Sequence, residues 1–383
     1  MNMNIRFCVF RVVSAWSLPG FALATWLPSG ASAAPLKEAK VTQVIEDVRL
    51  LESNASPRAA SVNDNVREGA AVRTGTQSRA ELTFTDQTLT RLGADTVFKF
   101  GAEPRRVDLD KGAVLIYMPK NAGGAKIRTG AVTAAITGTT VTVEYDHRPL
   151  GFIKYTVLEG SMCIRLHDEA VPIFAGQQLI FSPDATSLPQ PTSVDLKRLL
   201  ETSPLTSGFQ RPLASAGLIA GEARRQRESE AVIDNLIRGV RLAGSASARD
   251  ASAATFINVY SSLVIHAKKE ELCLYAIAAV TLRSDLIGEI LVATRKSREG
   301  EPRFTCECLQ RIIRAAIAAD FKAAGAIVQA GLYAEPYARD CIGGAAHAAD
   351  PCQEGTNKLL VPTQNGTINP ANSIDPPVVS PEQ

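Results

Sequence analysis

The stretch NVREGAAVRTGTQSRAELTFTDQTLTRLG, residues 65–93, decides the fold class of this chain. Several of its side chains alternate with polar neighbours in the period of two that half-buried strands show. These positions are Ala80, Leu82, Phe84, Thr88, Thr90 and Leu92. The charged residues expected at outward or turn positions are Arg73, Arg79, Glu81, Asp86 and Arg91. The stretch therefore predicts short strands joined by tight turns.

The same pattern continues on both sides, because turn signals recur about every 8 to 15 residues between residues 40 and 181. This spacing predicts an all-β domain over residues 40–181, built as a sandwich, a roll or a short β-solenoid. Its predicted structural turns include Gly69, Gly75, Gly93 and Gly138. For Gly75 we expect a positive φ, a conformation that glycine adopts at little cost.

Five pieces of this predicted domain resemble the FecR family, which is named for a periplasmic protein of iron-citrate signalling. In residues 72–93, V-R-T-G is followed by S-R-A-E-L-x-F-x-D-x-T-x-x-R-L-G. The other pieces follow in the family's order at 109–114, 127–143, 157–161 and 175–177. The resemblance covers residues 40 to about 181 and implies a FecR-like β domain. Regulatory members of the family carry a cytoplasmic anti-sigma segment and a transmembrane helix before this domain. Here five residues precede Arg6, so we expect no sigma-regulating role.

The N-terminus has the order of a secretory signal peptide, predicted over residues 1–33. Arg6 and Arg11 precede a mostly apolar stretch, and Ala31-Ser32-Ala33 offers a small-x-small cleavage pattern. The mature chain would then begin near Ala34, in the periplasm or outside the cell, with no integral membrane span left. The alternative is a retained membrane anchor, although Pro19 shortens the continuous apolar run.

Beyond the β domain the composition changes twice. Prolines and small polar residues predict a linker over residues 182–216, with a short helix near 194–200. Residues 217–350 have helical periodicity, and the proline-rich segment 362–383 is predicted to be disordered. The pairs Ile312/Ala315, Ile327/Ala330 and Ile342/Ala345 recur every 15 residues. This interval indicates either a repeat array of short helices or an alanine-rich bundle with an accidental period.

Six of the seven cysteines would remain after signal cleavage. An exported chain can form disulfides from them, and fifteen pairings are open. The glycines and proline between Cys341 and Cys352 favour that pair. Cys306 and Cys308 start a helix with side chains that point apart, so they are not expected to pair with each other. A zinc site is not expected, because the four histidines are scattered.

No catalytic, cofactor-binding or metal-binding residue is predicted. The chain lacks the G-x-S-x-G, H-E-x-x-H and P-loop patterns. A net charge of +2 and an aromatic content of 6% do not favour a nucleic-acid partner. A basic patch of Arg73, Arg79 and Arg91 could bind carboxylates. The alternative is a cross-strand network of these arginines with Glu81 and Asp86.

Together these features predict a non-enzymatic, exported binding or scaffold protein of the cell envelope. Its partner would be an envelope protein or a glycan, contacted chiefly by the helical region, because stacked helices present a continuous concave face. One alternative is a membrane-anchored signalling protein related to anti-sigma factors. An enzyme with an unrecognised site is a third.

Overall fold

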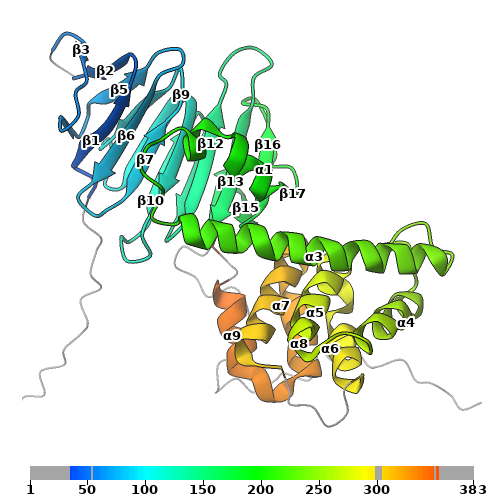
Figure 1. Ribbon diagram of the computed structural model, residues 1–383. Coiled ribbons are helices and arrows are strands. Elements are labelled where there is room, and N and C mark those ends of the chain that lie inside the picture. Colours follow the sequence, from blue (N-terminus) through cyan, green and yellow to red (C-terminus); the bar gives the residue numbers. More distant parts are fainter. Residues whose placement is uncertain (1–34, 53–54, 298–303, 349–350, 353–383) are drawn as a thin grey trace, which may run out of the picture. The chain divides into compact units, whose positions relative to one another are not determined.

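The computed structural model describes residues 35–52, 55–297, 304–348 and 351–352. The predictions of a signal peptide over 1–33 and of a disordered tail over 362–383 lie outside the described residues. Within them, a β region is followed by a helical region, as the sequence predicts (Figure 1).

The strands form two hydrogen-bonded layers, here named sheet A and sheet B. Sheet A runs in the order β4 (Asn65–Arg67), β1 (Glu38–Ile45), β6 (Arg79–Phe84), β7 (Leu89–Leu92), β9 (Arg106–Tyr117), β12 (Thr140–Tyr145), β13 (Ile153–Glu159), β16 (Gln177–Phe181) and β17 (Thr192–Ser193). Sheet B runs in the order β3 (Arg58–Ala59), β2 (Val48–Leu51), β5 (Ala71–Thr74), β8 (Val97–Phe100), β9, β10 (Ala125–Thr129), β11 (Val132–Ile136), β14 (Ser161–Leu166) and β15 (Glu169–Phe174). Neighbouring strands are antiparallel except β9 and β10.

Strand β9 belongs to both layers and joins them into one continuous sheet. Its first half pairs with β8 and β10 in sheet B, and its second half pairs with β7 and β12 in sheet A. The change occurs around Gly112, whose φ is +94°. A Cβ atom at Gly112 would lie 2.5 Å from Thr96 Cα, so the crossing requires glycine.

The main core lies between the two sheets. Phe84 of sheet A meets Phe100 of sheet B edge to face, with ring centroids 4.9 Å apart. Leu82, Val141 and Tyr155 are buried in the same core. The inward positions of the predicted alternation therefore fill the space between the layers, which confirms the all-β fold predicted from the sequence.

Turn glycines lie where the chain passes from one sheet to the other. Gly69 and Gly138 have φ values of 83° and 61°. The prediction of a positive φ for Gly75 is wrong, because Gly75 is the first residue of a turn in which Ser78 N donates to Gly75 O. The positive φ, 58°, falls instead on Gln77, and Gly93 does not have one either. The first residue of such a turn needs no left-handed conformation.

The segment predicted as a linker packs against the β region. It contains α1 (Leu196–Thr202) and α2 (Pro204–Ser207), and it leads into the long helix α3 (Ala216–Leu242). We call residues 194–223 the strap. Leu115 and Leu158 of sheet A pack with apolar strap side chains, namely Leu196, Leu205, Leu213, Ile219 and Ala223. The strap packs here because Leu115 points away from the main core, which holds its neighbours Val114 and Ile116.

The helical region continues with α4 (Ala253–Val264), α5 (Leu272–Leu282), α6 (Ile287–Lys296), α7 (Cys306–Ala319), α8 (Ala324–Ala334) and α9 (Arg339–Ala348). Helices α3, α5, α7 and α9 pack in one row, and α4, α6 and α8 pack in a second row (Figure 1). Ile312, Ile327 and Ile342 are buried in α7, α8 and α9. Each 15-residue interval therefore contains one α-helix and one 3-10 turn, and this unit repeats along the chain.

Three disulfides are present among the described residues: Cys163–Cys352, Cys273–Cys308 and Cys306–Cys341. The predicted Cys341–Cys352 pair is wrong, whereas the prediction that Cys306 and Cys308 do not pair is confirmed. Two bridges join neighbouring helices of one row, α5 to α7 and α7 to α9, and each spans 35 residues. Helix packing thus sets the pairing, and Cys352 lies against β14 instead.

By length and hydropathy, no single helix within the described residues could span a membrane. Helices α7 and α8 pass that test only as a pair, which is bent by 118°.

Candidate binding surface

The structure does not bring Arg73, Arg79 and Arg91 together as a solvent-facing patch. Arg73 is exposed on β5 in sheet B, whereas the other two lie on β6 and β7 in sheet A. Arg91 is 0% exposed, and Arg79 is only half-buried beside Gly208 of the strap. The prediction of a common basic patch is therefore wrong.

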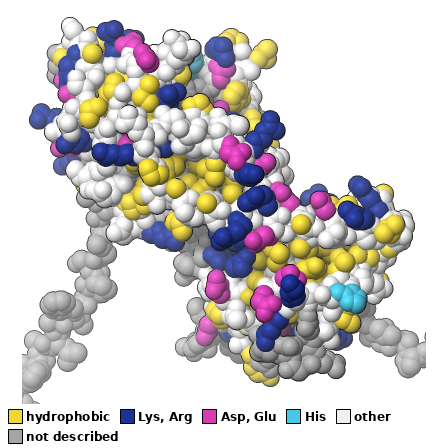
Figure 2. Space-filling model, in the orientation of Figure 1, with side chains coloured by type: hydrophobic (Ala, Val, Ile, Leu, Met, Phe, Trp, Pro, Cys, Tyr) yellow, Lys and Arg dark blue, Asp and Glu magenta, His cyan; other side chains and the backbone are white. Residues whose placement is uncertain are grey.

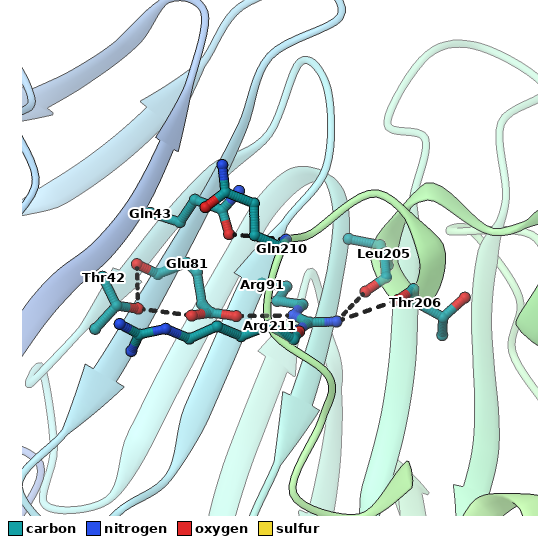
Figure 3. A network of polar contacts seen from close by, with 8 residues as sticks. All are labelled: Thr42, Gln43, Glu81, Arg91, Leu205, Thr206, Gln210 and Arg211. Atoms are coloured by element: carbon teal, nitrogen blue, oxygen red, sulfur yellow. Dashed lines mark hydrogen bonds and ion pairs between the residues drawn. The ribbon is translucent and has the colours of Figure 1, made fainter.

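Arg91 instead pairs across the strands with Glu81, its register partner on β6 (Figure 3). Arg91 Nε donates to Glu81 Oε2 at 3.0 Å, and Thr42 Oγ1 donates to Glu81 Oε1 at 2.8 Å. Both carboxylate oxygens therefore have partners. Arg91 and Glu81 therefore form the cross-strand ion pair that was the alternative to a basic patch, but this pair is buried beneath the strap. Asp86 pairs with Arg105, at 2.8 Å.

The remaining donors of Arg91 hold the strap. Nη1 donates to the carbonyl oxygens of Leu205 and Thr206 at 3.1 and 3.3 Å, and Nη2 donates to that of Arg211. The ring of Phe209 lies 4.4 Å from the Arg91 guanidinium carbon. Burial lowers the pKa of Arg91, and the hydrogen bond with Glu81 opposes that shift. The arginine therefore fixes the strap to the sheet and is not available to a ligand.

The helical region carries an open groove of about 720 Å³ along α4, α6 and α8. The small residues of its lining are buried or half-buried, and we call them the floor: Gly288, Ala293, Ala330 and Ala334. The larger apolar residues of its lining are half-buried or exposed, and we call them the walls: Ile257, Ile265, Val292 and Tyr333. Tyr333 is 90% exposed and Ile265 is 57% exposed. Figure 2 shows apolar side chains on the surface of the helical region beside charged ones. An apolar concave surface of this kind is typical of a binding site.

Two opposite charges line the groove on α6, Glu289 near its start and Lys296 at its end. Both are exposed, and neither forms an ion pair with another described residue. The pKa of Arg283 is raised chiefly by its hydrogen bond with Asp285, and the nearby charge of Glu289 adds a smaller contribution in the same direction. Both groove charges are thus available to a bound partner.

Within the described residues, no group of three or more histidine, cysteine or acidic side chains is arranged to hold a metal ion.

Residues 70–162 match the family described as FecR protein. This part of the chain is therefore similar to a FecR domain, and we call it the FecR domain below. The match lies inside the β region and includes the crossing strand β9. The resemblance stated from the sequence over residues 40 to about 181 is therefore confirmed over residues 70–162.

Two solved structures of a "putative anti-sigma factor" from Parabacteroides distasonis are similar to part of this chain. Each shares 14% identity with this chain and covers 34% of it, with a TM-score of 0.31. The chain spans 65% and 64% of those structures, which is less than two thirds of their length. No curated protein matches the chain.

The sequence did not predict the strap, and it predicted a concave face on the helical region without identifying the residues of the groove. For the strap there was a signal, because Leu115 interrupts a strict alternation with apolar neighbours on both sides. A sheet with apolar residues on both faces needs a cover on each. For the groove the signal was the small residues of α6 and α8, such as Gly288 and Ala330, but only the packing of the helices brings them together as one floor.

Proposed function

We propose that this protein is a non-enzymatic binding protein of the cell envelope that holds its partner in the groove along α4, α6 and α8. The observation that carries the proposal is the groove itself, with exposed Tyr333 and Ile265 on its walls. Such exposure costs free energy in water, and a partner that covers the groove would recover it. In this proposal the FecR domain is a rigid support for the helical region.

Export of the chain is supported by its cysteines. Every cysteine within the described residues is in a disulfide, and disulfides persist in oxidising compartments. Together with the signal-like N-terminus, this pairing favours the periplasm or the cell exterior over a reducing compartment. The envelope partner would be a protein or a glycan, and the apolar groove favours a protein.

The test is photo-crosslinking in intact cells with the full chain. A photoreactive phenylalanine analogue replaces Tyr333 in the groove in one variant and Tyr337, 81% exposed and outside the groove, in another. We expect a discrete envelope adduct from position 333 and none from position 337. Equal yields at both positions would reject the groove as the binding surface.

Export is tested separately by mass spectrometry of the N-terminus. We expect a chain that begins near Ala34. Intact Met1 in the membrane fraction would favour the membrane-anchored alternative.

A further inference from the structure

We infer that the groove binds an amphipathic α-helix of a partner protein, with an apolar stripe flanked by one cation and one anion about two turns apart. This inference rests on the proposed function and specifies its partner. It follows from the backbone, the floor and the charges of the groove.

The backbone of the groove favours a helical occupant. The three elements that line it, α4, α6 and α8, are helices whose backbone groups are already used within the helix. An extended peptide would bury its own N–H and C=O groups against an apolar surface without partners. Ser297 Oγ, one of the few polar atoms nearby, already donates to Ala293 O and Thr294 O. A helix has its backbone hydrogen bonds satisfied internally, so it can enter at a lower cost.

The floor of the groove accommodates a helix with large side chains. Gly288 of α6 lies against Ala330 of α8, and a Cβ at Gly288 would be 3.8 Å from Ala330 Cβ. Small side chains at the floor leave room for large apolar residues of the partner, while Ile257 and Tyr333 stand on the walls. This is the arrangement by which an amphipathic helix is bound through residues three and four positions apart.

The charges specify the partner further. Glu289 and Lys296 are seven residues apart on one helix, which is about 10.5 Å along its axis. A partner helix that lies along α6 meets a negative charge at one end of the groove and a positive charge at the other. Its complement is one basic and one acidic residue, also about seven positions apart. Opposite charges at the rim of an interface add specificity more than affinity.

The experiment measures binding of three fluorescein-labelled model helices to the full mature chain. All have the same apolar stripe, and the two positions seven residues apart are Glu and Lys, Lys and Lys, or Glu and Glu. We expect the mixed peptide to bind about two- to five-fold more tightly than either of the others, as exposed ion pairs allow.

Charge substitutions in the groove should move this preference. Glu289→Lys makes both groove charges positive and should favour the Glu/Glu peptide, whereas Lys296→Glu should favour the Lys/Lys peptide. The matched control is Asp234→Lys, because Asp234 and Arg241 are exposed opposite charges seven residues apart on α3, outside the groove. This control should leave the preference unchanged. Tyr333→Ala should weaken all three peptides, and Tyr337→Ala should weaken none.

Three outcomes would overturn the inference. The first is equal binding of the three peptides or unchanged preference in the charge variants. The second is displacement of the peptides by phosphatidylglycerol vesicles, which would identify a lipid surface. The third is sedimentation of the chain as a dimer that Tyr333→Ala dissociates, which would identify a second copy. If the photo-crosslink at position 333 forms while the peptides show no charge preference, the proposed function stands and the helical partner is rejected.

Discussion

The core of the β region and the core of the helical region differ in their share of alanine, which among the described residues is 7 of 37 buried residues in the β region and 11 of 30 in the helical region. The fully buried aromatic side chains are also divided unequally, because Phe84, Phe98, Phe100 and Tyr155 lie in strands, whereas Phe256 and Tyr260 lie in helices. The alanines of the helical core include Ala276, Ala279 and Ala316. Each alanine buries little apolar area, so packing contributes less free energy per residue.

The two regions differ correspondingly in covalent cross-links. Two disulfides lie within the helical region, at α5–α7 and α7–α9, whereas the described part of the β region has none, because its single cysteine in the sequence is Cys163. The third joins β14 to Cys352 beyond α9, where Arg165 also donates to Cys352 O. The difference indicates that cross-links supply the helical region with stability that its small side chains do not.

The largest effect is expected from Arg91→Leu in the FecR domain, which would leave Glu81, 1% exposed, as an unpaired buried charge. We expect a loss of about 3–5 kcal/mol in the free energy of unfolding, measured by urea denaturation. Hydrogen exchange should also rise in residues 205–211, which lose their anchor. Arg73→Leu, at an exposed arginine, is the control and should change little. An equal loss in both variants would show that the buried pair is not a main support of this region.

A double variant sharpens the same point. The double variant Glu81→Leu with Arg91→Leu leaves no unpaired buried charge, so its free energy of unfolding should exceed that of Arg91→Leu alone.

Removing a helical cross-link is the next test. Cys273→Ala with Cys308→Ala opens a loop of 35 residues, and loop-closure entropy predicts a loss of about 3–4 kcal/mol. Hydrogen exchange should show this loss in α5 and α7 and leave the FecR domain unchanged. Cys163→Ala with Cys352→Ala is the matched control and should not loosen the α5–α7 contact. If the β strands exchange as fast as the helices in the first variant, the contrast between the regions does not hold.

Two glycines of the FecR domain should respond differently to alanine. At Gly112, alanine meets Thr96 and adopts a positive φ, so we expect a loss of at least about 1–3 kcal/mol. At Gly75, the nearest atom to an added Cβ is Asp47 Oδ2 at 3.3 Å and φ is not positive, so the change should stay within about 0.5 kcal/mol. The melting temperatures of Gly112→Ala and Gly75→Ala show which variant loses more stability. The reverse order would mean that the sheet crossing at Gly112 tolerates a side chain.

The smallest effect concerns Glu159, which is 8% exposed at the end of β13. Burial raises its pKa above the ordinary 4.5, while Lys120 opposes the shift. The folded chain therefore holds this proton more tightly than the unfolded chain, and stability falls as the pH rises from 4.5 through the folded pKa. Glu159→Gln should thus melt higher than the parent at pH 7 and lose this advantage below the ordinary pKa. A difference that does not vary with pH would exclude the titration of Glu159 as its cause.

The sequence alone determined the local structure of this protein. Alternating residues such as Leu82 and Phe84 identified the β region, and the interval between Ile312 and Ile327 identified helices of similar length. Both patterns are local, because strands repeat every two residues and helices every 3.6. The FecR motif was found for the same reason, since its residues follow one another along the chain.

Tertiary structure decided what each of these elements faces. Arg91 looked like an outward residue because alternation does not show that the strap, more than 100 positions away, covers that face. Cys341 looked like the partner of Cys352 because the sequence does not show that the start of α9 lies against the start of α7. The groove likewise exists only where α4, α6 and α8 meet. Contacts between distant residues depend on the packing of whole elements, and a local pattern does not encode which face another element will cover.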